Sequence, residues 1–290
     1  WESGDSTGEV SLGNLFTTPK SISGLSSKNL EDIAFVTCRG GWPLAVSMER
    51  DIALDQAFDY IDAVEQRDIS AVDGVRRDPT RTHRLLRSYA RHQGAQAPLT
   101  TIKADLIANE SDSFDEDTIA SYITALKQIF VIEDVESWNP NLRSKSAIRT
   151  SDTRYFIDPS IATAAMGLGP MDLINDLNTF GLIFETLCIR DLKVYAESLN
   201  GKVYHFRDKT GLECDAVVHL RNGHYGLIEV KLGGDDAIKE GIETLQSLAN
   251  KIDTTKMKKP SFLMVLTAVG SYAYRNEQGV YIVPISCLKD

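Results

Sequence analysis

The sequence is poor in the features that mark several large classes of protein. It has only four cysteines in 290 residues, widely separated and without a CxxC spacing, so we expect neither a disulfide framework nor a zinc site of the common spacings. No apolar run approaches the ~20 residues that a membrane span requires. The amino terminus has no basic segment followed by an apolar one, which a secretory signal would need. These absences predict a protein of the reducing cytoplasm that does not enter a membrane.

Positive charge is also scarce. The chain has 31 lysines and arginines against 41 aspartates and glutamates, a formal net charge of −10. A phosphate backbone would repel the chain as a whole, so any contact with DNA or RNA must use local basic patches. With 42% hydrophobic and 25% charged residues, the composition excludes a disordered chain, and the length indicates about two folded domains.

The first part of the chain, residues 1–79, reads as a helical lead-in. We expect residues 1–20 to be loosely ordered, because serine, threonine and glycine dominate them. A helix should follow Asn29 and end at the Arg39-Gly40-Gly41-Trp42-Pro43 segment, since paired glycines and a proline terminate helices. A second helix is predicted over about 44–66, and one buried face of it should hold Ile52, Leu54, Ala57, Phe58 and Ile61.

Residues 80–170 have the pattern of a winged helix, a small helical unit that ends in a β-hairpin. The predicted helices cover 81–92, 100–108 and a segment that follows the acidic cluster 115–117. The predicted strands cover 130–135 and 154–158. A basic loop over 139–150 would form the wing, with cations at Arg143, Lys145, Arg149 and Arg154. Because the third helix opens on three acids, we expect this unit to pack against protein rather than enter a DNA groove.

Residues 171–290 change in character and predict an α/β fold with a mixed sheet. The expected order is a helix, a β-hairpin, a further helix and more strands. The predicted helices cover 172–195 and 235–251. The predicted strands cover 203–207, 213–220, 225–232, 261–266 and 280–285. The chain as a whole is therefore expected to be α/β, with a helical segment and a winged helix preceding this last domain.

The residues that could carry chemistry lie in the predicted hairpin 213–232. Strand alternation places Glu229 and Lys231 on one face, whereas Ile228 and Val230 point to the other face, which we take as the core side. Likewise, Asp215 points away from its apolar neighbours. An acid and a lysine therefore leave an otherwise apolar strand together.

The turn of this hairpin decides whether the two acids meet. A two-residue Asn222-Gly223 turn would set Asp215 opposite Val230, whereas a three-residue loop with Gly223 in the left-handed conformation would set Asp215 opposite Glu229. We expect the three-residue loop. Two carboxylates so close repel unless a cation lies between them or one is protonated. Paired acids with a lysine suit phosphodiester hydrolysis assisted by Mg²⁺ or Mn²⁺.

This arrangement of an aspartate, about a dozen residues and then Glu-x-Lys resembles the PD-(D/E)XK restriction-endonuclease-like superfamily. The resemblance implies a restriction-endonuclease-like fold in which Asp215, Glu229 and Lys231 are catalytic and the acids hold a metal ion. It implies Glu185, on the preceding helix, as a further metal ligand. It also implies Gln246, on the following helix, as a polar residue beside the lysine.

Two details around this motif bear on what it can do. Arg207 and Lys209 flank the hairpin and could contact nucleic-acid phosphates, although ion pairs with Asp208 or Glu213 compete for them. Cys214 precedes Asp215 where the superfamily has its proline.

More narrowly, the blocks 181–185, 206–215 and 228–231 resemble the carboxy-terminal domain of unknown function of bacterial and archaeal AAA-type ATPases. The Arg39–Pro43 segment is similar to the end of the ATPase lid in those proteins. No G-x-x-x-x-G-K-[ST] loop is present, and the chain begins without Met. We therefore expect a piece of a longer protein, without ATPase activity, whose partners are an upstream ATPase domain of the same chain, DNA or RNA, and further copies of itself. The alternative function is a non-catalytic recognition or oligomerisation module attached to the ATPase.

Overall fold

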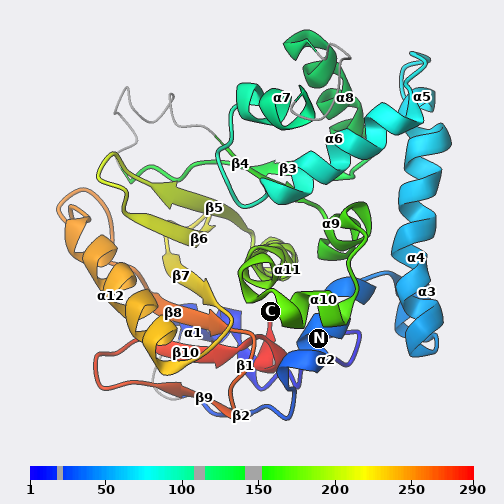
Figure 1. Ribbon diagram of the computed structural model, residues 1–290. Coiled ribbons are helices and arrows are strands. Elements are labelled where there is room, and N and C mark those ends of the chain that lie inside the picture. Colours follow the sequence, from blue (N-terminus) through cyan, green and yellow to red (C-terminus); the bar gives the residue numbers. More distant parts are fainter. Residues whose placement is uncertain (18–21, 108–114, 141–151) are drawn as a thin grey trace. The chain divides into compact units, whose positions relative to one another are not determined.

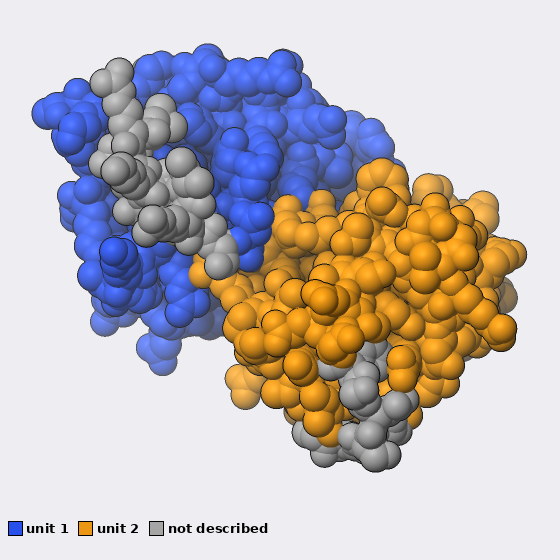
Figure 2. All heavy atoms as spheres, turned by 90° about the horizontal axis from the view of Figure 1, so that it is seen from above, with its two compact units in different colours: residues 1–33, 135–152, 187–290 blue, residues 34–134, 153–186 orange. Residues whose placement is uncertain are grey.

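The computed structural model describes residues 1–17, 22–107, 115–140 and 152–290. The chain forms two compact units, each assembled from separate stretches of sequence (Figure 2). Unit 1 comprises residues 1–33, 135–152 and 187–290, and unit 2 comprises residues 34–134 and 153–186. Helices α2 (Leu30–Arg39) and α11 (Leu177–Ser198) each begin in one unit and end in the other.

Unit 1 is built on a seven-stranded mixed sheet with the order β2-β9-β10-β8-β7-β6-β5 (Figure 1). Neighbours are antiparallel from β5 to β7 and from β10 to β2, whereas β7, β8 and β10 are parallel. The strands are β2 (Gly24–Leu25), β5 (Gly201–Arg207), β6 (Glu213–Leu220), β7 (Tyr225–Lys231), β8 (Phe262–Thr267), β9 (Tyr272–Arg275) and β10 (Tyr281–Pro284). The predicted strands of this region are all present, and β2 and β9 were not predicted.

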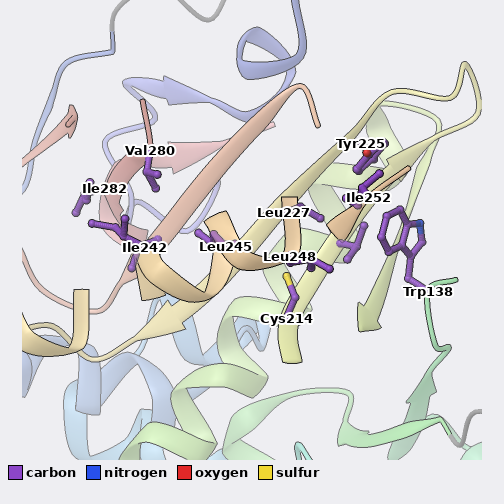
Figure 3. Packing of buried hydrophobic residues seen from close by; sticks show 12 residues of the cluster. Trp138, Cys214, Tyr225, Leu227, Ile242, Leu245, Leu248, Ile252, Val280 and Ile282 are labelled. Carbon is purple, nitrogen blue, oxygen red and sulfur yellow. The ribbon is translucent and has the colours of Figure 1, made fainter. Parts of the chain in front are cut away.

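Helix α12 (Asp235–Lys251) covers one face of this sheet. Asp235 and Asp236 lie in its first turn and Lys251 in its last turn, the charge order that a helix dipole favours. Its apolar residues are spaced so that Ile242, Leu245 and Leu248 pack together against the strands, with Leu227 of β7 and Val265 of β8 in the same buried cluster. Figure 3 shows Leu245 and Leu248 near Leu227 and Cys214, and Ile242 near Ile282. This helix has the bounds that the sequence predicted.

The first residues of the chain are packed, contrary to the prediction of a loose lead-in. Strand β1 (Val10–Ser11) pairs in parallel with β11 (Leu288–Lys289), near the far end of the sequence. Helix α1 (Leu12–Thr17) then buries Leu12, Leu15 and Phe16, and the ring of Phe16 lies 5.0 Å from that of Phe262. A composition rich in small polar residues did not reveal these few apolar anchors.

Unit 2 is mainly helical. Its remaining helices are α3 (Pro43–Val46), α4 (Arg50–Ala63), the π-helix η1 (Val64–Asp68), α5 (Ile69–Ala71), α6 (Pro79–Arg91), α7 (Leu99–Ile107), α8 (Glu116–Gln128), α9 (Pro159–Met166) and α10 (Pro170–Asn175). The single helix predicted over 44–66 is divided between α3 and α4. Of the residues on its predicted buried face, Ala57 and Ile61 are buried as expected, whereas Ile52 and Phe58 are exposed and Leu54 is partly buried. A helix predicted to begin at 172 is divided at Asp176 into α10 and α11.

Three helices and a two-stranded sheet follow one another in unit 2, as the winged-helix pattern predicted. Helices α6, α7 and α8 are followed by β3 (Ile132–Val135) and β4 (Thr153–Phe156), which pair with each other. Asp115 caps α8 by accepting a hydrogen bond from the Thr118 amide at 2.7 Å. The predicted wing residues Arg143, Lys145 and Arg149 lie outside the described residues, and Arg154 donates a hydrogen bond to the Ala97 carbonyl. The winged-helix assignment itself stays a prediction.

The Arg39–Pro43 segment ends α2 and is held against the start of α9. Gly40 has φ +74°, and a Cβ there would lie 2.4 Å from an oxygen of Asp158, so only glycine fits. The Gly41 amide donates to Asp158 Oδ2 at 2.9 Å, and Trp42 Nε1 donates to Ser160 Oγ at 2.8 Å. The segment therefore has a structural role within unit 2.

The mixed α/β class that the sequence predicted is confirmed. Among the described residues, no helix has the length and apolar character needed to cross a bilayer. The predicted division at residues 79 and 170, and the restriction-endonuclease-like fold, stay predictions.

Candidate functional site

The β6–β7 hairpin has the register that brings the two predicted acids together. Ala216 pairs with Ile228, and Val218 with Gly226, so the next position along the ladder holds Asp215 and Glu229. The loop contains three residues and ends on Gly223 at φ +81°, closed by a hydrogen bond from the Leu220 amide to the His224 carbonyl at 2.8 Å. The three-residue loop expected from the sequence is therefore confirmed.

A β-bulge lies at the position of Asp215. Between the pairs Tyr204–Val217 and Phe206–Cys214, strand β6 has the two residues Asp215 and Ala216 where β5 has one. Such a bulge re-aims a side chain and interrupts the ladder. The Asp215 carboxylate takes the place of a ladder acceptor, with Oδ2 accepting the Val230 amide at 2.7 Å. Asp215 is thus fixed to β7, next to Glu229.

Glu229 and Lys231 lie on a covered face of the sheet. They share the face of Leu227, which α12 covers, and Glu229 is only 3% exposed. A Cβ on Gly241 of α12 would lie 3.4 Å from Glu229 Cβ and 3.5 Å from Lys231 Cε. The glycine therefore lets the backbone of α12 lie close above both side chains. The prediction that the opposite face alone is the core side is wrong, because residues on both faces of β7 are buried.

The acid and the lysine form an ion pair that leaves part of the acid unsatisfied. Lys231 Nζ lies 3.2 Å from Glu229 Oε2. Glu229 Oε1 is buried and has no hydrogen-bond partner, and the same holds for the hydroxyl of Thr267. Thr267 pairs with Lys231 across β7 and β8, so its side chain lies on the same face. A buried polar atom without a partner is costly and calls for a ligand, an ion or a water.

Thr267 is a site residue that the sequence pattern did not reveal. The only signal is that the apolar strand 262–266 ends on a polar residue. Such an ending is common, and only the strand order, with β8 beside β7, makes it informative.

The electrostatics of the site show a shortage of positive charge. Burial raises the pKa of Glu229 to about 8, and the nearby charge of Asp215 adds to the effect. Burial also raises the pKa of Asp215, against the opposing effects of the Val230 amide and Lys231. Burial lowers the pKa of Lys231, but the charges of Glu229 and Asp215 outweigh it and the net pKa is raised. One ammonium does not neutralise two buried carboxylates, so either a proton or a further cation completes the charge balance.

These residues fit a hard divalent cation in their donor chemistry. Carboxylate oxygens are the preferred ligands of Mg²⁺ and Mn²⁺, and Glu229 Oε1 is an available buried carboxylate oxygen. Among the residues that the structure describes, no group of three or more His, Cys, Asp or Glu side chains is placed to hold a metal ion. Asp215 and Glu229 would therefore share an ion with water or substrate oxygens. Magnesium commonly keeps several waters in such sites.

Glu185, the predicted additional ligand, lies on α11 within unit 2. The hydroxyl of Tyr155 donates to Glu185 Oε1 at 2.5 Å, and Gly94 lies close to the same carboxylate. Its role as a metal ligand stays a prediction.

The predicted nucleic-acid contacts lie on different elements of unit 1. Arg207 forms an ion pair with Glu213 at 2.9 Å, one of the competing pairs that the sequence indicated. Lys209 is exposed, and Gln246 on α12 is half-buried. Cys214, where the superfamily motif has proline, is buried, and burial raises the pKa of its thiol. It is therefore unreactive.

Comparison with known proteins gives two family matches. Residues 30–172 match a family described as a domain of unknown function (DUF8612), and residues 180–288 match one described as a domain of unknown function (DUF4143). No curated protein and no solved structure matches the chain. The second match is compatible with the resemblance to the carboxy-terminal domain of AAA-type ATPases. Over most of its length, the chain is thus similar to two families whose function is not described.

Proposed function

We propose that unit 1 hydrolyses phosphodiester bonds of DNA or RNA with Mg²⁺ or Mn²⁺, at a site formed by Asp215, Glu229 and Lys231. The observation that carries the proposal is the hairpin register, which sets Asp215 beside Glu229 and leaves one buried carboxylate oxygen without a partner. A cation bound there would give that oxygen a partner, as the ammonium of Lys231 does for the other oxygen of Glu229.

Each residue has a role that follows from its position. Asp215 and Glu229 would hold the ion, which supplies charge neutralisation at the phosphate and a more acidic bound water. The Val230 amide orients Asp215 through its 2.7 Å hydrogen bond. Lys231 keeps its proton because the two carboxylates raise its pKa, so it can donate a hydrogen bond to a phosphate oxygen and stabilise negative charge that develops there.

A cleavage assay tests this proposal. Labelled single- and double-stranded DNA and RNA are incubated with Mg²⁺ or Mn²⁺ and the full chain. We expect Glu229→Gln and Lys231→Met each to reduce the cleavage rate by about 100-fold or more, as loss of a group that stabilises a transition state does. Lys239→Met, at an exposed lysine of α12, should leave the rate unchanged. Cleavage that persists in both site variants, or no cleavage with either ion, would contradict the proposal.

A second candidate is the non-catalytic recognition or oligomerisation module attached to an AAA-type ATPase. The observation that favours it is the burial of the Glu229–Lys231 pair under Gly241 of α12, which a purely structural pair would also show. This module would retain its fold but neither bind a divalent ion at Asp215 nor cleave nucleic acid.

A further inference from the structure

Unit 1 has a groove of about 570 Å³ where α11 ends and the edge strand β5 begins. This volume is in the range of small-ligand sites, roughly 300–1,000 Å³. The groove is lined by residues of α11, β5, β6 and the β6–β7 loop, among them Lys193, Glu197, Lys202, Tyr204, His219 and Arg221. It lies at the turn end of the hairpin, whereas Asp215 and Glu229 lie at the open end.

The charge of this groove is opposite to that of the chain. Among the described residues, the lining includes the cations Lys193, Lys202 and Arg221 and the acid Glu197, in a chain of net charge −10. Lys202 Nζ is 2.6 Å from Glu136 Oε1, but both side chains are about half exposed, and such pairs contribute little. A phosphate could therefore displace Glu136. Three cations in the lining of one groove favour an anionic ligand.

A planar ring lies beside one of these cations, Lys202. The ammonium of Lys202 is 5.4 Å from the centre of the Tyr204 ring, and the Tyr204 and His219 rings are 6.3 Å apart. Trp138 Nε1 donates to His219 Nδ1 at 3.4 Å, so the other ring nitrogen, Nε2, carries the proton. Burial lowers the pKa of His219. The groove thus combines cations with aromatic rings.

The base of the groove depends on Gly201. A Cβ there would lie 2.6 Å from Leu220 Cδ2 and 3.2 Å from the carbonyl oxygens of Ala196 and His219. Glycine thus favours the close approach of β5 to the last turn of α11. The cations of α11 and β5 are consequently held on well-defined elements.

We propose that this groove binds a nucleotide unit, with its phosphate on Lys202 and Arg221 and its base on Tyr204. Cations beside an aromatic ring recognise a phosphate and a base together, and they do so for a free nucleotide and for a single strand alike. The proposal rests on the groove and is independent of any cleavage or metal binding at Asp215.

Fluorescence anisotropy with the full chain in EDTA tests this proposal without cleavage. The probe is a labelled single-stranded oligonucleotide of about 12 nucleotides, within the site sizes of single-strand binders, and the competitors are AMP and inorganic phosphate. We expect the double variant Lys202→Glu/Arg221→Glu to weaken binding about tenfold or more and to reduce the dependence on salt. The matched charge reversal Lys239→Glu, outside the groove, should change binding less than about twofold.

The aromatic part of the proposal has its own variants. Tyr204→Leu should weaken binding about fivefold or more, because stacking on a base is lost, whereas Tyr204→Phe should bind as the wild type does. Competition by AMP at the same groove would identify a free nucleotide, and competition by oligonucleotide alone would identify a strand. Absence of binding by the wild type, an unchanged double variant, or equal competition by inorganic phosphate and AMP would overturn the proposal. Mn²⁺ binding at Asp215 is measured separately, so failure of the groove and failure of the nuclease site are distinguishable.

Discussion

At the scale of single residues, Glu229 determines what the site can do. It is buried beside Asp215, and Lys231 satisfies only one of its two oxygens. A carboxyl group in this position stays neutral unless a cation favours its charged form. The pKa of Glu229 is raised first by burial and then by the charge of Asp215, and a bound cation would lower this pKa and also give the free oxygen a partner.

The raised pKa of Glu229 predicts a pH-dependent stability. Its pKa is about 8 in the folded protein and 4.5 for the ordinary side chain, so between these values the folded state binds a proton that the unfolded state releases. The free energy of unfolding should therefore fall as the pH rises from about 5 to about 8. The pKa of Asp215 is also raised, so this residue should likewise make the free energy of unfolding fall as the pH rises through the acidic range.

Urea unfolding of the wild type and of Glu229→Gln at about pH 5 and about pH 8 measures this decrease in the free energy of unfolding. Glutamine cannot ionise, so the variant should lose most of the decrease in stability. An equally steep decrease in Glu229→Gln would assign the pH dependence to other groups.

At the scale of elements, close packing of β7 against β8 depends on Gly226. A Cβ there would lie 2.1 Å from Cζ of the Phe262 ring. We expect Gly226→Ala to lower the free energy of unfolding by about 1–3 kcal/mol through overpacking. Gly181, inside α11, has no atom within 4 Å of the position that a Cβ would take, so Gly181→Ala should stabilise by about 0.5–1 kcal/mol. Urea titrations measure whether the free energy of unfolding falls in Gly226→Ala and rises in Gly181→Ala. An unchanged free energy of unfolding in Gly226→Ala would contradict the close packing at this position.

The elements show how far the sequence could predict this structure. Strand β6 and helix α12 were predicted with the bounds they have, because their apolar periods and end signals are strong. Strands β1, β2 and β11 were missed, since two residues give no period. Alternation divided the residues of β7 correctly between two faces, but the prediction that only one face is covered was wrong. A strand's own sequence does not say what packs on each face. That information resides in α12, where Gly241 permits the approach.

The candidate site was predictable to a similar degree. The pairing of Asp215 with Glu229 follows from the loop length, which Gly223 indicated. The β-bulge at Asp215 depends on the pairing of β6 with β5, and the position of Thr267 depends on the order of the strands. Both are long-range properties that local sequence patterns do not contain.

At the scale of the whole molecule, unit 1 needs segments that are distant in sequence. Residues 1–33 and 135–152 belong to it together with 187–290, and Leu12 and Leu15 are buried. A fragment of residues 171–290 lacks these segments and should expose apolar surface that the full chain covers. We expect it to bind the dye ANS strongly and to unfold without a sharp transition. A fragment that unfolds cooperatively at the Tm of the full chain would contradict this expectation.

Calorimetric titration with Mn²⁺ tests the central claim, that Asp215 and Glu229 form a cation site, most directly. The wild type and Glu213→Gln, which removes an exposed acid two residues from Asp215, should bind the ion with the same isotherm. Asp215→Asn should lose that binding, because a carboxylate that holds the ion is replaced by a neutral amide. No binding by the wild type, or an unchanged isotherm for Asp215→Asn, would contradict a cation site at these two acids.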